Sequence, residues 1–314
     1  MQTLNKEITE QLYDIIILGG GVAGLAAAMT AGRLGLQVLV LEKAVFGGSV
    51  AVLESVEEYP GIERIGGWEL TQGMVKQARD AGCKLIDSIE AVEVAASVEG
   101  NFEIRSSDAV LRHARTVIVC TGGQPRMLEL AEETHFAQRG IHTCVQCAGA
   151  RYSGQTVAIA GNSSWAVRAA VHLLDLGCTV LYITGETELC RDASSIKELL
   201  GNANFRFLGG CHITGLYGKE KLEEILVTSL TGGNYQKIAV SAVFVYRGIK
   251  PNSSMVSARK DRNGFLEVDE NSMTSLPGVF AAGRVAEADL PIAAMAEEGS
   301  KAAHGAGSLL QAKA

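Results

Sequence analysis

A glycine-rich turn near the N-terminus constrains the fold of this chain more than any other stretch. The run Gly19-Gly-Gly-Val-Ala-Gly24 follows a short apolar segment, Asp14–Leu18, and precedes a helical pattern over Leu25–Leu34. A buried strand that leads through such a turn into a helix is typical of a dinucleotide-binding βαβ unit, because bare glycines let the backbone approach a pyrophosphate at the helix N-terminus. The cofactor contacts expected in this turn are Gly19, Gly21, Val22, Ala23 and Gly24.

An acidic residue ends the next predicted strand. Glu42 follows the apolar run Val38–Leu41, and its spacing from the glycine turn is that of a carboxylate that accepts hydrogen bonds from the adenosine ribose. The dinucleotide therefore has a free 2′-hydroxyl, and FAD and NAD both fit. Lys43 and the segment Gly47-Gly48-Ser49 come next, and we expect their backbone to pass close to the same flat ligand.

Two further segments are expected to reach this ligand. The buried strand pattern Thr116–Cys120 runs into Thr121-Gly122, a second turn that can bring backbone against the dinucleotide. Val92, within the strand pattern of Ala91–Ala95, is also included among the expected contacts.

Composition narrows the class of protein. The chain has 314 residues, enough for two domains, and a formal net charge of −7 gives no basic footprint for nucleic acid. No apolar run is long enough to span a membrane, and Met1–Leu12 has no signal-peptide layout. Seven cysteines is an odd number, which suits a reducing cytosol. We therefore expect a cytoplasmic protein.

The pair Cys144-Val-Gln-Cys147 is the second informative motif. This spacing closes a disulfide readily and lowers a thiol pKa, but it also suits a structural disulfide or half of a zinc site. Zinc would require a second pair or histidines at ligand spacing. The remaining cysteines stand singly: Cys83, Cys120, Cys178, Cys190 and Cys211. A redox pair is favoured, and no metal site is expected.

A second βαβ pattern lies in the middle of the chain. It consists of Thr156–Ala160, a helix over Ser164–Leu176 and Thr179–Ile183. We expect an α/β fold with two Rossmann-like, three-layer nucleotide-binding domains, the second inserted in the first. The first would comprise residues 1–122 plus 248–314, and the insert, residues 123–247, would carry the cysteine pair.

Through essentially its whole length the sequence resembles low-molecular-weight thioredoxin reductase, a homodimeric FAD protein. The resemblance rests on the order of several motifs: the first glycine turn, Gly47-Gly48, Tyr59-Pro60-Gly61, Thr121-Gly122, Cys144-x-x-Cys147, Gly248-Ile-Lys-Pro-Asn252 and Pro277-Gly-Val-Phe-Ala-Ala-Gly283. It implies FAD as cofactor, a homodimer, and further flavin contacts at Gly283, Arg284, Ile292 and Ala293. Arg284 stands where the family has Asp.

The resemblance also implies roles for the two sulfurs. Cys147 would exchange electrons with the flavin, and Cys144 would form the mixed disulfide with a redox partner. The family usually has an acidic residue directly after the second cysteine, where this chain has Ala148. The acid would then be a water or His142, or exchange would be slow. The departure makes another protein's disulfide or a small dithiol as fitting a substrate as thioredoxin.

The second glycine turn departs from the family in two ways. It reads Gly161-Asn-Ser-Ser-Trp-Ala166, so Ser163 replaces a glycine and Trp165 crowds the helix start. Glu186 stands where the family has basic residues, and a carboxylate repels a 2′-phosphate. We expect NADPH binding to be lost, as in family members that take electrons from ferredoxin.

Four functions remain open from the sequence. The expected one is an FAD-dependent dithiol–disulfide oxidoreductase that works without NADPH. The alternatives are an NADPH-dependent thioredoxin reductase with a divergent site, a dithiol oxidase that uses oxygen, and a low-turnover flavin redox sensor. An acidic ferredoxin would need a basic docking face, for which the candidates are Lys219, Lys221, Arg247 and Lys250.

Overall fold

The computed structural model describes residues 11–97, 100–190, 196–233 and 235–312. The chain forms two compact units, one that runs to Gln124 and resumes at Lys250, and one formed by Pro125–Ile249. The two strands at these crossings, β7 (Gly123–Pro125) and β16 (Ile249–Pro251), pair with each other.

The first unit is built on a seven-stranded sheet in which β3-β2-β1-β6-β5-β4 are neighbours in that order and β17 also pairs with β6. Its strands are β1 (Leu12–Leu18), β2 (Val38–Leu41), β3 (Lys84–Ile86), β4 (Ala91–Ala96), β5 (Phe102–Ser106), β6 (Leu111–Val119) and β17 (Val279–Ala281). The pairs β1–β2, β2–β3, β1–β6 and β6–β17 are parallel, whereas β5 is antiparallel to both β4 and β6.

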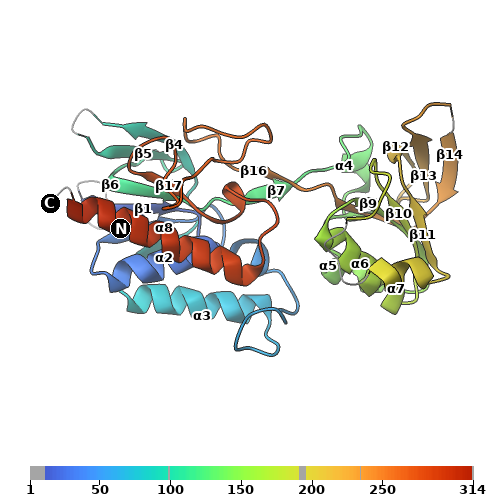
Figure 1. Ribbon diagram of the computed structural model, residues 1–314, viewed down its shortest axis with the longest axis horizontal. Helices are drawn as coiled ribbons and strands as arrows, with labels where there is room; N and C mark the ends of the chain where they lie inside the picture. Colours follow the sequence, from blue (N-terminus) through green and yellow to red (C-terminus); the bar gives the residue numbers. More distant parts are fainter. Residues whose placement is uncertain (1–10, 98–99, 191–195, 234, 313–314) are drawn as a thin grey trace. The chain divides into compact units, whose positions relative to one another are not determined.

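Both faces of this sheet are covered, which explains the continuous apolar run of β1. Ile15 and Ile17 face a core shared with three helices, α2 (Val22–Arg33), α3 (Gly67–Asp80) and α8 (Ile292–Ala312), which lie together in Figure 1. Ile16 and Leu18 point the other way into a core shared with β4 and β5. The alternation of β1 thus supplies two cores from one strand.

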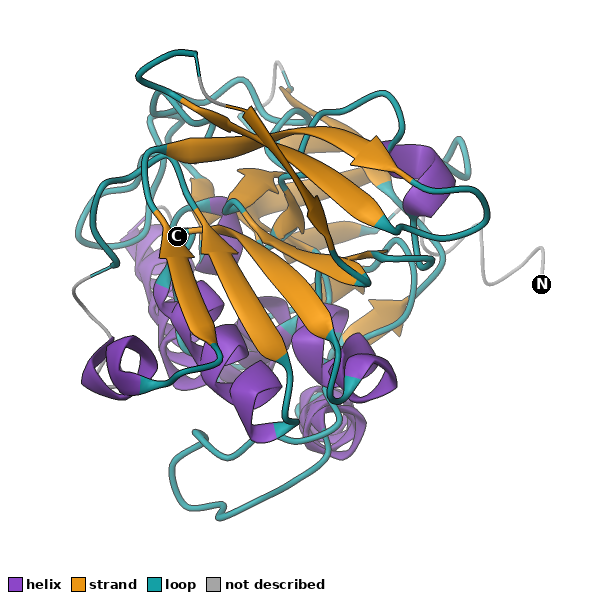
Figure 2. Cartoon of the chain, turned by 90° about the vertical axis from the view of Figure 1, so that its right-hand side faces the viewer, coloured by secondary structure: helices purple, strands orange, loops and turns teal. Residues whose placement is uncertain are grey.

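The second unit is built on a parallel sheet with the order β11-β10-β9-β15-β8. Its strands are β8 (Ile141–His142), β9 (Thr156–Gly161), β10 (Thr179–Ile183), β11 (Phe205–Leu208) and β15 (Ala242–Tyr246). One face packs on α5 (Val145–Ala148), α6 (Ser164–Asp175) and α7 (Ile196–Gly201). The other face packs on a three-stranded antiparallel sheet of β12 (Cys211–Tyr217), β13 (Glu224–Ser229) and β14 (Tyr235–Ala239), as Figure 2 shows.

The expected fold class, α/β with two Rossmann-like sheets, is therefore confirmed. The remaining short elements are α4 (Glu133–Phe136) and the single-turn helices η1 (Gly48–Val50), η2 (Gly149–Tyr152) and η3 (Gly283–Val285). None of the helices in the described ranges combines the length and apolar character that a membrane crossing requires.

Candidate active site

The first glycine turn joins β1 to α2, and its backbone is packed so closely that a side chain at Gly19 or Gly24 would clash with it. Gly19 has a φ of 99°, and a Cβ there would lie 2.4 Å from the carbonyl oxygen of Cys120. A Cβ on Gly24 would lie 1.9 Å from the carbonyl oxygen of Gly19. Gly19 therefore allows the turn, and Gly24 allows α2 to pack tightly against it.

Glu42 is held in place by this turn. It is 8% exposed, and its two carboxylate oxygens accept hydrogen bonds from the backbone N–H groups of Gly20 at 2.7 Å and Ala44 at 2.9 Å. Each oxygen keeps a further lone pair that can accept from a ribose hydroxyl. The N-cap of α2 is Gly21, which makes no side-chain capping bond, so the first amides of this helix are available to a phosphate.

A cavity of about 400 Å³ opens at this turn within the first unit. Most of the residues expected to contact the cofactor line it: Gly19, Gly21, Val22, Ala23, Glu42, Lys43, Gly47, Gly48, Ser49, Thr121, Gly122 and Arg284. Apolar residues that were not among the expected contacts also line the cavity: Val45, Val50, Val52, Met255 and Met295.

Five expected contacts do not line this cavity. Val92 lies on β4 with its side chain 58% exposed, and the neighbouring Ala91 lines the cavity instead. Gly24 lies behind the turn, Gly283 donates its N–H to Glu298 at 2.8 Å, and Ile292 and Ala293 form the start of α8. From this last region only Met295 reaches the cavity.

Asn252 is a cavity residue that the sequence analysis quoted only within a motif. Its side-chain amide donates to the carbonyl oxygen of Thr121 at 2.9 Å, and the Thr121 hydroxyl donates to the carbonyl oxygen of Asn252 at 2.5 Å. This reciprocal pair fixes the Thr121-Gly122 turn against the wall of the cavity. Its position directly after Gly248-Ile-Lys-Pro was the available signal.

Arg284 brings a positive charge to the same cavity. Its side chain is half-buried and its Nε donates to the carbonyl oxygen of Ala288 at 3.2 Å. Burial lowers the pKa of its guanidinium, and Asp289 opposes that shift. The guanidinium stays charged at neutral pH, so this wall favours an anionic group.

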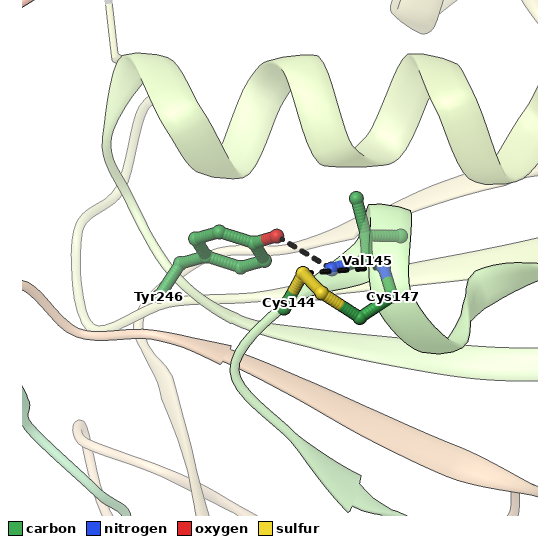
Figure 3. The surroundings of a disulfide bond; sticks show 4 residues. All are labelled: Cys144, Val145, Cys147 and Tyr246. Carbon is green, nitrogen blue, oxygen red and sulfur yellow. Dashed lines mark hydrogen bonds between the residues drawn. A yellow bond between two sulfur atoms is a disulfide. The ribbon is translucent and has the colours of Figure 1, made fainter. Parts of the chain in front are cut away.

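The cysteine pair lies at the carboxyl edge of the sheet of the second unit. Cys144 and Cys147 are joined in a disulfide with Cα atoms 5.4 Å apart. Cys144 is the N-cap of α5, and its Sγ accepts a hydrogen bond from the Cys147 N–H at 3.1 Å. Tyr246, at the end of β15, points its hydroxyl at the N–H of Val145, as Figure 3 shows. The disulfide bond favours a redox pair over half of a zinc site.

Three of the other five cysteines are unsuited to this role. Cys83, Cys120 and Cys178 are buried free thiols, and burial raises the pKa of all three. A raised pKa keeps a thiol protonated and unreactive. Within the ranges that the structure describes, no group of three or more His, Cys, Asp or Glu side chains is arranged to hold a metal ion.

His142 is not suited to be the missing acid. It is 3% exposed, and its Nε2 lies 2.7 Å from the Tyr152 hydroxyl. Burial, and to a lesser extent Arg151, lower the pKa of its imidazole to about 4. The ring is therefore neutral near pH 7 and has no proton to release easily. Ala148, after the pair, is buried and has no polar group.

The second glycine turn, between β9 and α6, differs in its hydrogen bonding. Gly161 has a φ of 137°, and a Cβ there would lie 2.0 Å from the carbonyl oxygen of Tyr246. Ser163 is the N-cap of α6, and its hydroxyl accepts from the N–H of Ala166 at 3.2 Å. The half-buried Trp165 follows, with the Arg168 guanidinium 5.2 Å from its ring centroid. The start of α6 is therefore capped by its own chain.

Asn162 ties this turn to the loop after β10. Its Oδ1 accepts from the Cys190 N–H at 2.8 Å, and its Nδ2 donates to the carbonyl oxygen of Glu188 at 3.0 Å. The Tyr182 hydroxyl donates to the same Oδ1 at 3.4 Å. The loop that Asn162 holds, Thr184–Cys190, carries two exposed carboxylates.

One Rossmann-like unit has a cavity over a glycine turn without a side-chain cap, and the other has a disulfide at the edge of its sheet. Together these features define a nucleotide-dependent disulfide oxidoreductase. The chain belongs to the pyridine nucleotide-disulphide oxidoreductase family, whose model matches residues 13–307.

Relatives and solved structures place it beside the thioredoxin reductases. The thioredoxin reductase of Treponema pallidum is 30% identical over 301 residues, which cover 95% of this chain and 97% of that protein. A 34.2 kDa protein in the rubredoxin operon of Clostridium pasteurianum is 31% identical over 278 residues, 88% of this chain and 90% of that protein. The crystal structure of Lactococcus lactis thioredoxin reductase matches with a TM-score of 0.85 at 26% identity, covering 96% of this chain and 99% of its own. The protein is thus a thioredoxin reductase-type flavin disulfide oxidoreductase.

FAD is the cofactor of this family, and the residues of the first unit fit it. The bare glycine turn and the uncapped start of α2 suit a pyrophosphate, and Glu42 suits the ribose of the ADP half. Apolar residues in the lining, among them Val52 and Met295, suit a flat ring. When bound, FAD supplies the redox centre that accepts and releases two electrons.

Proposed function

We propose that this protein is an FAD-dependent dithiol–disulfide oxidoreductase that passes electrons between the flavin and Cys144–Cys147, and on to a partner disulfide, without NADPH as donor. The observation that carries the proposal is the self-capped start of α6, where the Ser163 hydroxyl holds the Ala166 N–H. A dinucleotide phosphate would have to bind this same N–H group and its neighbours.

The surrounding side chains support the same conclusion. Both ends of the Asn162 side-chain amide are hydrogen-bonded to the loop after β10. These bonds fix that loop to the glycine turn itself. The loop carries Glu186 and Glu188, both exposed, and carboxylates repel the 2′-phosphate of NADPH. Steric closure and charge therefore both act against this nucleotide.

The cysteine pair is the proposed carrier of electrons to the substrate. Two electrons and two protons convert the Cys144–Cys147 disulfide to two thiols, and exchange with a partner disulfide returns the pair to its oxidised form. We assign the flavin side to Cys147 and the mixed disulfide to Cys144, on the family resemblance. In the structure Cys147 is exposed and Cys144 is half-buried, and trapping of a mixed disulfide tests the assignment.

The proposal also covers the substrate, the electron donor and the oligomeric state. Relatives named thioredoxin reductase support a thioredoxin-like disulfide protein as substrate, ferredoxin is the proposed donor, and we propose a cytoplasmic homodimer. Lys219, Lys221 and Arg247 are exposed on the second unit, although Arg247 donates to the carbonyl oxygens of Met127 and Leu128. The two lysines are therefore the freer basic groups for an acidic donor.

Anaerobic titration of the yellow protein tests the donor. We expect millimolar NADPH or NADH to leave the flavin absorbance unchanged, and reduced ferredoxin to bleach it fully, with dithionite as the positive control. Rapid, saturable bleaching by either nucleotide would return the protein to the NADPH-dependent reductases.

The Cys147→Ser protein separates the flavin from the pair. It should bind FAD normally and be bleached by the low-potential donor, yet transfer no electrons to a protein disulfide. The same variant, mixed with an oxidised thioredoxin, should accumulate a mixed disulfide through Cys144. A mixed disulfide formed only in Cys144→Ser would reverse the two roles.

A further inference from the structure

Tyr246 is a residue beside the cysteine pair to which the sequence analysis gave no role. It ends β15, next to β8 in the sheet, and its hydroxyl accepts a hydrogen bond from the Val145 N–H at 3.1 Å. Val145 directly follows Cys144, so the phenol ring lies against the start of the Cys-x-x-Cys turn (Figure 3). The rigid sheet therefore positions this hydroxyl at the redox pair.

The proton of this hydroxyl is still available. Among the described residues the Tyr246 oxygen accepts the Val145 bond and its proton is donated to no acceptor. Burial raises the pKa of the phenol to about 12, which the Val145 hydrogen bond only partly offsets. The group therefore stays a hydrogen-bond donor at every pH at which the protein would work.

The other residues near the cysteine pair are less suited to donate a hydrogen bond to it. Ala148 stands where the family has an acid, His142 is neutral and bonded to Tyr152, and burial raises the pKa of the Tyr152 phenol. Arg151 is exposed, on η2 just beyond the pair. Because the pKa of the His142 imidazole is lowered and that of the Tyr152 phenol is raised, neither changes its charge between about pH 6 and pH 9.

We propose that Tyr246 is a positioning residue for Cys144: when the disulfide opens, the Tyr246 hydroxyl donates a hydrogen bond to the Cys144 sulfur while its oxygen keeps the Val145 N–H. The inference rests on the proposed redox role of the pair. Opening the bridge takes two electrons and two protons from the reductant and the solvent, and Tyr246 keeps its own proton throughout. A sulfur that accepts from both Tyr246 and the Cys147 N–H is stabilised as a thiolate.

The test measures the reactivity of Cys144 and needs neither a flavin donor nor a partner. Full-length Cys147→Ser protein, reduced with dithiothreitol and then freed of it, is alkylated with iodoacetamide across about pH 5 to pH 10, and modification of Cys144 is followed by peptide mass spectrometry. Adding Tyr246→Phe should slow alkylation near pH 7 about tenfold and move the midpoint of the pH profile up by about one unit. At high pH, where the thiolate is fully formed, the two rates should converge.

Tyr152→Phe is the matched control, because it removes a nearby phenol that bonds to His142 and not to Val145. Its pH profile should coincide with that of the parent. An unchanged profile in Tyr246→Phe overturns the inference, and so does an equal shift in Tyr152→Phe. Failure here with a normal donor titration would leave the proposed function intact, whereas bleaching by NADPH would not affect this result.

Discussion

The two strand–turn–helix segments of the molecule, Gly19–Gly24 and Gly161–Ala166, share a backbone plan and differ in what satisfies their helix N-termini. In the first, the N-cap of α2 is a glycine without a side-chain bond, and the turn is tied down from behind by Glu42. In the second, the N-cap of α6 is Ser163, whose hydroxyl takes an amide of the first turn.

This difference shows that a glycine turn can bind a phosphate only while the backbone N–H groups at the helix start are not bonded to the chain's own side chains. Glu42 is buried and braces the turn while keeping lone pairs for a ribose. Glu186, the corresponding acidic residue after β10, is exposed, and its carboxylate does not hold the second turn in this way. The Glu186 N–H donates to the Thr184 hydroxyl at 3.2 Å. In the first segment the start of α2 has no side-chain cap, whereas in the second Asn162 bonds to the loop after β10.

Exchanging glycine and alanine at the matching position of the two turns gives the largest expected contrast. Gly24→Ala would place its Cβ 1.9 Å from the Gly19 carbonyl oxygen, so we expect loss of bound FAD and of about 3 kcal/mol of stability. The reverse change at the matching position, Ala166→Gly, should cost about 1 kcal/mol through helix propensity alone and keep FAD. Flavin content and thermal unfolding measure both, and a fully yellow Gly24→Ala protein would contradict the packing argument.

Reopening the second turn is the next sharpest test. Ser163→Gly frees the Ala166 N–H, and Glu186→Arg replaces repulsion by a charge-assisted bond to phosphate. Because each such bond is worth about 1.5–3 kcal/mol, the double variant should bind NADPH about 10-fold to 100-fold more tightly than the parent. Calorimetric titration with NADPH measures this gain.

Ser163→Gly with Glu220→Arg is the control for that gain, because Glu220 is an exposed carboxylate of the same unit that lies between β12 and β13. It adds equal positive charge and should bind no better than Ser163→Gly alone. Equal tightening in both proteins would show that overall charge, rather than the turn, decides affinity.

Acid should destabilise the second unit through His142. Its pKa in the folded protein, about 4, lies below the ordinary value of 6.5, so between these values the unfolded chain binds the extra proton. Stability therefore falls as the pH drops from about 6.5 towards 4, by about 2 kcal/mol between pH 7 and pH 5. His142→Gln should remove most of this loss in urea unfolding, whereas the exposed His212→Gln should not. An unchanged acid dependence in His142→Gln would show that the imidazole titrates normally.

The sequence by itself determined the α/β class, the glycine turn and part of the cavity lining. These follow from local rules: a buried strand needs a continuous apolar run, and a tight turn needs glycine at positions such as Gly19. The disulfide at Cys144–Cys147 is also local, because three residues of backbone suffice to close it.

Only the tertiary structure decided what surrounds those motifs. Tyr246 lies about one hundred residues after Val145, and Asn252 lies 131 residues after Thr121, so no pattern along the chain pairs them. The burial that lowers the pKa of His142 comes from neighbours on other elements, among them Tyr152 and Phe244. Val92 was expected to contact the cofactor but is exposed, while its neighbour Ala91 lines the cavity. A shift of one position along a strand decides which face of the sheet a side chain occupies. Hydrogen bonding and desolvation depend on distances in space, and the packing of the sheets sets those distances.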